Sequence, residues 1–153
     1  MNYDKELIVV NEENGVFRYD GDCFNINNEI IELLKRKASE APLKRSRILL
    51  HKDVNSNAQQ MLICISKDSL IPLHHHQKAK ETITVIQGQL EYIYKSKGKE
   101  IKMFLCSSKV NNMVCTKENI PHKLKALSDF AIFVECSDGP FSGKMSLLND
   151  EKC

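Results

Sequence analysis

The sequence lacks three features that would assign it to a common functional class. Its 22 basic and 20 acidic residues leave a net charge of +2, which is too balanced to argue for a nucleic acid or an anionic membrane surface as partner. Its six cysteines include no CxxC pair, which weakens a structural zinc site. No apolar run approaches the length of a transmembrane span. We therefore expect neither a nucleic acid nor a membrane as partner.

A secretory signal is also missing from the first residues. The segment Met1–Glu6 is acidic, and only four apolar residues follow it. We therefore expect a cytoplasmic protein with reduced cysteines. Cys64 and Cys136 lie inside apolar runs, where a free thiol packs as a small hydrophobic group, and Cys153 is expected in an exposed tail.

The N-terminal third predicts two short strands and one helix. At 153 residues the chain has the length of one domain, without internal repeat, low-complexity tract or linker. Residues 6–10 and 16–19 have strand patterns, separated by turn-forming residues. Residues 28–40 have the apolar spacing of an amphipathic helix, with Asn27 as its N-cap and Pro42 just beyond its end.

From residue 47 onward the pattern predicts β-structure. Many short strands at nearly even spacing, separated by turn signals, indicate a sandwich or a barrel. The expected strands are Ile48–Leu50, Met61–Ile65, Leu70–His76, Thr82–Ile86, Leu90–Tyr94, Ile101–Leu105, Lys123–Leu127 and Phe130–Cys136.

Four of the five histidines carry the strongest chemical signal. Side chains alternate along a strand, so His74 and His76 should share one face while His75 points the opposite way. With the carboxylate of Glu81 and the distant imidazole of His122, this pair offers three nitrogens and one oxygen to a divalent cation. We expect one metal ion per chain, with zinc, iron, manganese and nickel all compatible.

These residues fit the first cupin motif, HxH-x4-E-x6-G, which ends here at Gly88. His122 lies where the second motif supplies its single histidine. The chain thus resembles the cupin superfamily, which implies a mainly β fold: a single double-stranded β-helix (jelly-roll) barrel, here with a short α-helical N-terminal segment. The second motif departs from its usual form, because Lys117 stands at its proline and Asn119 at its glycine. Asparagine tolerates the left-handed conformation of that glycine, so the turn before His122 should survive.

The order of segments narrows the resemblance to the WbuC type of cupin-fold metalloprotein. A helix, a basic segment ending at His51, the HxH motif and a closing segment 133–141 follow one another as in that family. The resemblance implies a role in bacterial surface-polysaccharide (O-antigen, lipopolysaccharide) biosynthesis and a small-molecule ligand, such as a carbohydrate. It also divides the chain into an N-terminal segment 1–46, a metal-binding barrel 47–142 and a tail 143–153.

Roles outside the metal shell follow from the same comparison. His51 is a candidate acid–base or substrate-contacting residue, and a hydrogen-bonded structural histidine is the alternative interpretation. Arg47 and Gln59 are candidate substrate-binding residues, although Arg47 also suits a solvated surface. Tyr92 and Tyr94 share a strand face, where packing explains them more simply than sugar stacking.

Three functions are compatible with this sequence. The first is a metalloenzyme, of isomerase or epimerase type, acting on a sugar or sugar-nucleotide derivative with the ion as Lewis acid. The second is a binding module that holds a small molecule without turning it over. The third is an Fe(II)-dependent dioxygenase. By analogy with other cupins we also expect a homodimer.

Overall fold

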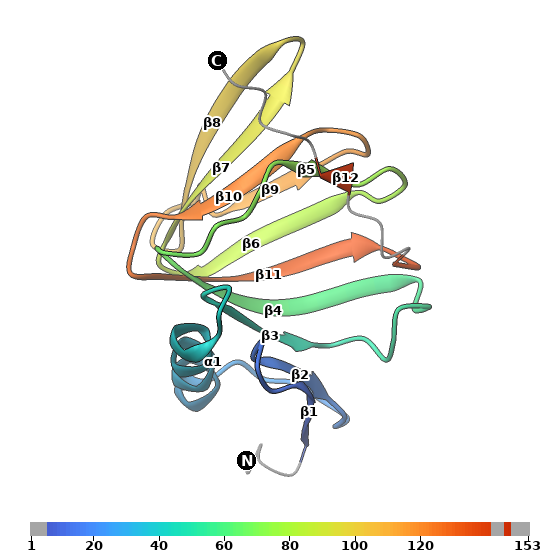
Figure 1. Ribbon diagram of the computed structural model, residues 1–153, viewed down its shortest axis with the longest axis vertical. Helices are drawn as coiled ribbons and strands as arrows, with labels where there is room; N and C mark the ends of the chain where they lie inside the picture. The colour runs from blue at the N-terminus through green and yellow to red at the C-terminus, as the bar shows by residue number, and fades with distance from the viewer. Residues whose placement is uncertain (1–5, 142–145, 148–153) are drawn as a thin grey trace.

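The computed structural model describes residues 6–141 and 146–147, and these form one helix and twelve strands (Figure 1). Cys153 lies outside the described residues. The helix α1 spans Asn28–Glu40. The strands are β1 Leu7–Asn11, β2 Val16–Tyr19, β3 Arg45–Leu49, β4 Ala58–Ser66, β5 His74–His75, β6 Glu81–Gln87, β7 Gln89–Ser96, β8 Lys99–Cys106, β9 Met113–Thr116, β10 His122–Ala126, β11 Phe130–Asp138 and β12 Ser146–Leu147.

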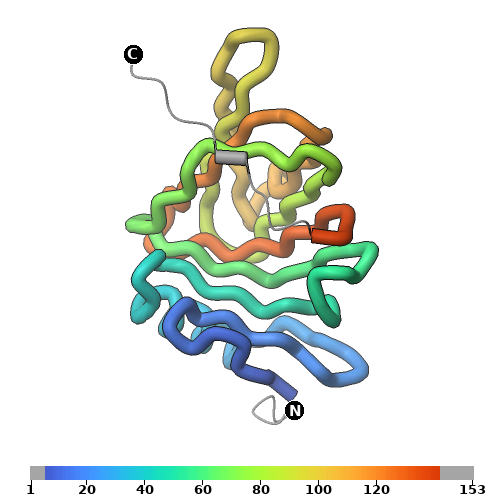
Figure 2. The backbone as a smooth tube through the Cα atoms, turned by 45° about the vertical axis from the view of Figure 1, so that its right-hand side comes forward, coloured from blue at the N-terminus to red at the C-terminus, as the bar shows by residue number. Residues whose placement is uncertain are grey.

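Two sheets face each other, as expected for a jelly roll. The larger has the order β1-β2-β3-β4-β11-β6-β9, and the smaller has the order β12-β5-β10-β7-β8. Figure 2 shows how they curl around a common interior. Buried side chains from both sheets fill it, among them Ile83, Tyr92, Leu124 and Phe133. We call the side of the seven-stranded sheet that carries Ile83 and Phe133 its inner face.

The helix packs on the opposite, outer face of the seven-stranded sheet. The Asn27 side chain accepts a hydrogen bond from the Ile30 backbone N–H at 3.0 Å, which confirms the predicted N-cap. Ile30 and Leu34 lie on the buried stripe of the helix and pack against Ile48 and other outer-face side chains. The N-terminal strands continue this same sheet, because β2 pairs with β3 in parallel.

Two parts of the strand prediction were wrong. The segment predicted as a strand over Leu70–His76 forms only the two-residue β5, and Pro72 has no N–H to donate to a ladder. Strand β9 was missed because only Val114 and Thr116 of its four residues are buried, which leaves too short an alternating pattern. It pairs with β6, so Thr116 lies opposite Glu81.

Two residues with positive φ shape the turns around the motif. Gly88 has φ +84, and an added Cβ would lie 2.3 Å from the Phe130 carbonyl oxygen. Glycine is therefore required there by both conformation and space. Asn119 has φ 59, which confirms the left-handed conformation predicted for the second motif. In the part of the chain that the structure describes, no helix combines the length and apolar character needed to cross a membrane.

Candidate metal centre

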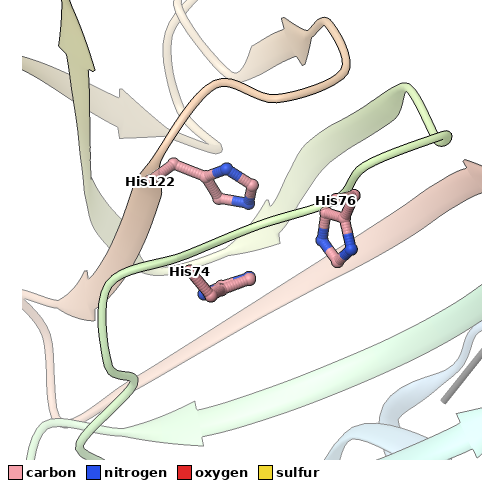
Figure 3. Close-up of side chains that lie close together, drawn as sticks. All are labelled: His74, His76 and His122. Carbon is pink, nitrogen blue, oxygen red and sulfur yellow. The ribbon is translucent and has the colours of Figure 1, made fainter. Parts of the chain in front are cut away.

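Two strands of the smaller sheet bring three histidines together (Figure 3). His122 begins β10 and is the direct antiparallel partner of His74 in β5. His76 follows β5 by one residue and turns toward the same point. The ring centroids lie 4.4 Å apart for His74 and His122, 5.2 Å for His74 and His76, and 5.4 Å for His76 and His122. One ligand nitrogen from each lies within 4.8 Å of the other two, so the group can hold a metal ion.

Backbone carbonyls fix the orientation of two of these rings. Nδ1 of His74 lies 2.9 Å from the Pro72 carbonyl oxygen, and Nδ1 of His122 lies 2.8 Å from that of Ile120. An oxygen that only accepts requires Nδ1–H on each ring, which leaves Nε2 with a free lone pair. Histidine ligands of metal ions commonly have this arrangement.

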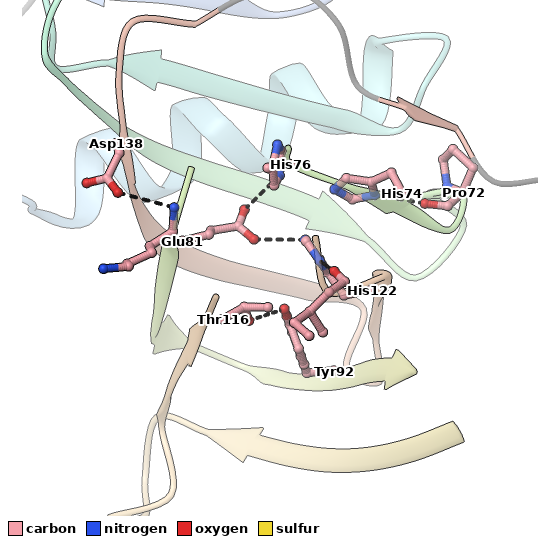
Figure 4. A network of polar contacts seen from close by, with 10 residues as sticks. Pro72, His74, His76, Glu81, Tyr92, Thr116, His122 and Asp138 are labelled. Carbon is pink, nitrogen blue, oxygen red and sulfur yellow. Dashed lines mark hydrogen bonds and ion pairs between the residues drawn. The ribbon is translucent and has the colours of Figure 1, made fainter. Parts of the chain in front are cut away.

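Glu81 places a buried carboxylate beside two of the histidines (Figure 4). Its Oε2 lies 2.9 Å from Nε2 of His122, and its Oε1 lies 3.8 Å from Nε2 of His76. Two atoms bound ~2.1 Å from one ion lie roughly 3.0–3.4 Å apart, so the shorter distance is close to that between two ligands. Glu81 contacts His122 and His76 but is not part of the group whose atoms all lie within 4.8 Å.

Unpaired buried atoms show that these residues fit a cation. Among the described residues, three buried side-chain atoms have no hydrogen-bond partner while the imidazoles are neutral: Nε2 of His76, Nε2 of His122 and Oε2 of Glu81. Only a proton on Nε2 of His122 would let it donate to Oε2 of Glu81, 2.9 Å away. All three offer lone pairs toward one another, an arrangement that is unfavourable unless a proton or a metal ion lies between them. A divalent ion would satisfy all three at once.

The pKa shifts agree with this arrangement. Burial lowers the pKa values of His74 and His76, which keeps both imidazoles neutral and ready to donate a lone pair. For His122 burial acts in the same direction, but the hydrogen bond and charge of Glu81 outweigh it and raise the pKa. Burial would raise the pKa of Glu81, yet the hydrogen bond and charge of His122 lower it. Without an ion, therefore, a proton is favoured between Glu81 and His122.

The sequence prediction missed the role of Tyr92 and Thr116. The Tyr92 ring stacks on His122 with centroids 5.5 Å apart and an interplanar angle of 15°. The Tyr92 hydroxyl hydrogen-bonds to the hydroxyl of Thr116 in β9. Burial raises the pKa of Tyr92, so the phenol stays protonated. Tyr92 thus packs as predicted, but what it packs against is a candidate metal ligand.

A second carboxyl group, that of Glu135, was also missed. Glu135 of β11 lies on the inner face opposite Ile83 of β6. Ile83 and Glu81 are two residues apart on the same face of β6, so the carboxyl groups of Glu135 and Glu81 are neighbours. Burial, with the charge of Glu81, raises the pKa of Glu135 well above its usual value, and Arg47 opposes the shift. Its side chain is half-buried by surface area. The sequence did contain a signal for this position: Glu135 is two residues from Phe133 on one strand, so the two side chains must point to the same face.

The other predicted residues are not members of the three-histidine group. His75 is outside the three-histidine group, as strand alternation predicted. Nδ1 of His51 lies 2.9 Å from the Gln60 carbonyl oxygen and 3.0 Å from the Gln60 backbone nitrogen, so this atom is engaged by the backbone. The Gln59 amide donates to the Asp53 and Ser56 carbonyl oxygens and thereby holds the β3–β4 loop. Arg47 is exposed on the inner face of β3. The functional roles of His51, Gln59 and Arg47 stay predictions.

The turn before His122 also anchors His76. The Asn119 backbone N–H donates to the His76 carbonyl oxygen at 2.8 Å. The left-handed Asn119 therefore connects the loop that leads to one histidine with the segment that carries another. This contact helps to hold His76 where the strand β5 has already ended.

Solved structures of cupins are similar to this chain in fold. An oxalate oxidase in complex with the substrate analogue glycolate has a TM-score of 0.58 and 14% identity, over 72% of this chain and 58% of that one. A Bacillus subtilis oxalate decarboxylase has a TM-score of 0.53 and 21% identity, over 63% and 26%. A conserved Streptococcus pyogenes protein of unknown function has a TM-score of 0.50 and 13% identity, over 64% and 77%.

These likenesses establish the fold alone. The chain spans little more than half of the oxalate oxidase chain and about a quarter of the decarboxylase chain. No curated protein matches the chain in sequence. One family model, described as a domain of unknown function (DUF6016), matches residues 26–105, which is more than half of the chain and includes the HxH motif and Glu81. The protein therefore has the cupin fold and belongs to the DUF6016 family.

Proposed function

We propose that this protein is a cupin metalloenzyme that acts on a sugar or sugar-nucleotide derivative. The observation that carries the proposal is the convergence of His74, His76 and His122 beside the buried carboxylate of Glu81. Three buried lone pairs without partners have a plain physical explanation in a bound divalent ion. A structural site would be closed by its four ligands, whereas an octahedral ion held by these four keeps two positions for water or substrate.

The four side chains would hold the ion through three imidazole nitrogens and one carboxylate oxygen. When bound, such an ion supplies Lewis acidity that polarises a carbonyl or acidifies a water molecule. Zinc, iron, manganese and nickel all suit this donor set, which contains no thiolate. The carbonyl groups of Pro72 and Ile120 keep the rings of His74 and His122 in the tautomer that can bind.

The residues around the ligands shape the reaction space. The stacked ring of Tyr92 fixes the plane of His122, and the apolar side chains between the sheets exclude bulk water. Glu135 places a second carboxyl group next to Glu81 on the inner face, and burial with the charge of Glu81 raises its pKa well above the usual value. In its protonated form this group can donate a hydrogen bond to Glu81 or to a substrate.

The biological setting of the proposal rests on the resemblance to the WbuC type. The order of helix, basic segment, HxH motif and closing segment supports a cytoplasmic role in the synthesis of bacterial surface polysaccharides, and analogy with other cupins supports a homodimer. A second candidate is an oxygen-dependent cupin. The likeness in fold to an oxalate oxidase favours it, since that protein is an oxidase of a small acid.

Metal analysis followed by turnover assays tests the proposal. Protein purified without chelator or a nickel column should contain about one divalent ion per chain by elemental analysis, and His76→Ala should lose it. His75→Ala is the matched control, because this neighbouring imidazole lies outside the group. Metal-loaded protein should then convert a nucleotide-sugar, with conversion lost in His76→Ala.

Each outcome separates the candidate functions. Iron together with oxygen consumption would favour the oxygen-dependent cupin, whereas zinc, manganese or nickel would oppose it. Nucleotide-sugars that raise the melting temperature without being converted would replace the enzyme with a binding module. Protein that retains no ion at any concentration tested, or an equal loss of metal in His75→Ala, would refute the metal centre.

A further inference from the structure

Three of the four arginines in this sequence lie on one face of the seven-stranded sheet. The arginines are Arg18, Arg36, Arg45 and Arg47. Arg36 is exposed on α1, whereas the other three lie on β2 and β3. The helix covers the outer face of this sheet, and Glu81 of the metal centre lies on the inner face. The three arginines can therefore share a ligand with the metal centre only if they lie on the inner face.

The strand register places them on the inner face. Arg18 is aligned with Leu49, Leu49 with Met61, and Met61 with Glu135, so Arg18 and Glu135 belong to the same row across the sheet. Arg47 is aligned with Ile63, and Ile63 with Phe133, which is part of the buried core between the sheets. Arg45 is aligned with Ile65 of the same core. Residues aligned across neighbouring strands point to the same side.

Among the described residues, no carboxylate forms a direct ion pair with any of the three guanidinium groups, although Glu135 lies within electrostatic range of Arg47. Arg45 and Arg47 instead repel each other: burial lowers the pKa of Arg45, and the charge of Arg47 lowers it further. Keeping like charges together without a counter-ion is unfavourable, and an anionic ligand would relieve it.

Glu135 links this arginine face to the metal centre. It is a neighbour of Glu81 across the β11–β6 pairing on one side, and it lies within electrostatic range of Arg47 on the other. Adjacent strands are about 4.8 Å apart, so β3 lies roughly 14 Å from β6 across the sheet. A ligand that touches both sites must therefore be extended, with its metal-binding group and its anionic group separated by several bonds.

We propose that Arg18, Arg45 and Arg47 bind the diphosphate group of an extended substrate whose opposite end reaches the metal centre. Arginine suits this role because its planar fork donates two parallel hydrogen bonds to phosphate oxygens and keeps its charge. Three arginines match the two to three negative charges of a diphosphate better than the single charge of a simple carboxylate. The inference rests on the proposed function and specifies its substrate class: a sugar joined to a diphosphate.

Calorimetric titration of metal-free protein with inorganic pyrophosphate tests the arginine face by itself. Wild-type protein should bind pyrophosphate, and Arg47→Gln should weaken the affinity by about tenfold or more, as loss of a bidentate charged contact predicts. Arg18→Gln should weaken it as well. Arg36→Gln is the matched control, an exposed arginine on the outer side, and should bind as wild type does. Arg47→Lys, which keeps the charge but not the fork, should give an intermediate affinity.

The outcomes are distinct from those of the metal experiment, because chelated protein retains the arginines. No binding of pyrophosphate at millimolar concentration would overturn the inference, even if the metal centre is confirmed. Equal weakening by Arg36→Gln, or sulfate binding as tightly as pyrophosphate, would reduce the face to an unspecific positive surface. The three arginine positions are exposed or half-buried, so these variants should fold, which an unchanged melting temperature verifies.

Discussion

The hydrogen bond between Tyr92 and Thr116 offers a quantitative test of how the centre is supported. Tyr92→Phe removes the phenolic oxygen and leaves the ring that stacks on His122. The variant breaks the hydrogen bond and leaves the buried Thr116 hydroxyl without this partner, and an unsatisfied buried group of this kind costs about 1–3 kcal/mol. We expect the free energy of unfolding to fall by about 1–3 kcal/mol, while metal affinity stays near that of the wild type.

The decisive comparison is the double variant Tyr92→Phe with Thr116→Val. Replacing both partners removes the unsatisfied hydroxyl, so the double variant should regain much of the stability that the single variant loses. Urea unfolding of the metal-free proteins measures these differences, because it excludes stabilisation by a bound ion. Tyr92→Leu serves as the contrast, since it removes the stacked ring and should weaken metal binding.

Three results would refute this reasoning. A Tyr92→Phe variant as stable as the wild type would show that the hydroxyl pair contributes nothing. Strictly additive losses in the double variant would show that Tyr92 and Thr116 are not coupled. Equal metal affinities of Tyr92→Leu and the wild type would remove Tyr92 from any role in orienting His122.

The site and the core give three further predictions. A free Zn²⁺ or Mn²⁺ concentration of 100 times Kd should raise the free energy of unfolding of the wild type by about 2.7 kcal/mol, which is measured as a higher melting temperature. His122→Ala should lose this shift, whereas His75→Ala should keep it. Because burial lowers the pKa of His76, the unfolded chain binds a proton at this residue more readily than the folded chain does, so metal-free protein should lose stability as the pH falls below about 6.5. Urea titrations at pH 7 and pH 5 should show a smaller loss in His76→Gln. An unchanged loss would contradict the pKa shift. Burial raises the pKa of the Cys64 thiol to about 12, whereas a hydrogen bond with Ser108 lowers the pKa of the Cys106 thiol. Iodoacetamide at pH 8 should therefore modify Cys106 in the native protein and spare Cys64, which peptide mass spectrometry measures.

Much of the fold could be predicted from local patterns. The helix at 28–40 follows from its apolar stripe and from the Asn27 cap, both of which act within a few residues of the chain. Most of the longer strands follow from alternation and from turn residues such as Gly88. The short extent of β5 and the existence of β9 could not be predicted, because both depend on pairing with distant strands rather than on their own residues.

The sequence by itself determined the ligand chemistry that this chain can offer to a metal ion. His74, His76, Glu81 and His122 have ligand side chains and motif spacing, and the alternation of side chains along a strand predicts that His75 points away. These are local properties of residue type and period. The same motif positions include no cysteine, so the sequence predicts a donor set without thiolate.

Only the tertiary structure decided what surrounds those ligands. Tyr92 stacks on His122 because β7 and β10 pair, Thr116 reaches Tyr92 through β9, and Glu135 meets Glu81 because β11 lies beside β6. The arginines of β2 and β3 share the inner face with Glu135 for the same reason. Such contacts join residues far apart in the chain, so they depend on strand register. A shift of register by one residue would turn each of these side chains to the opposite face.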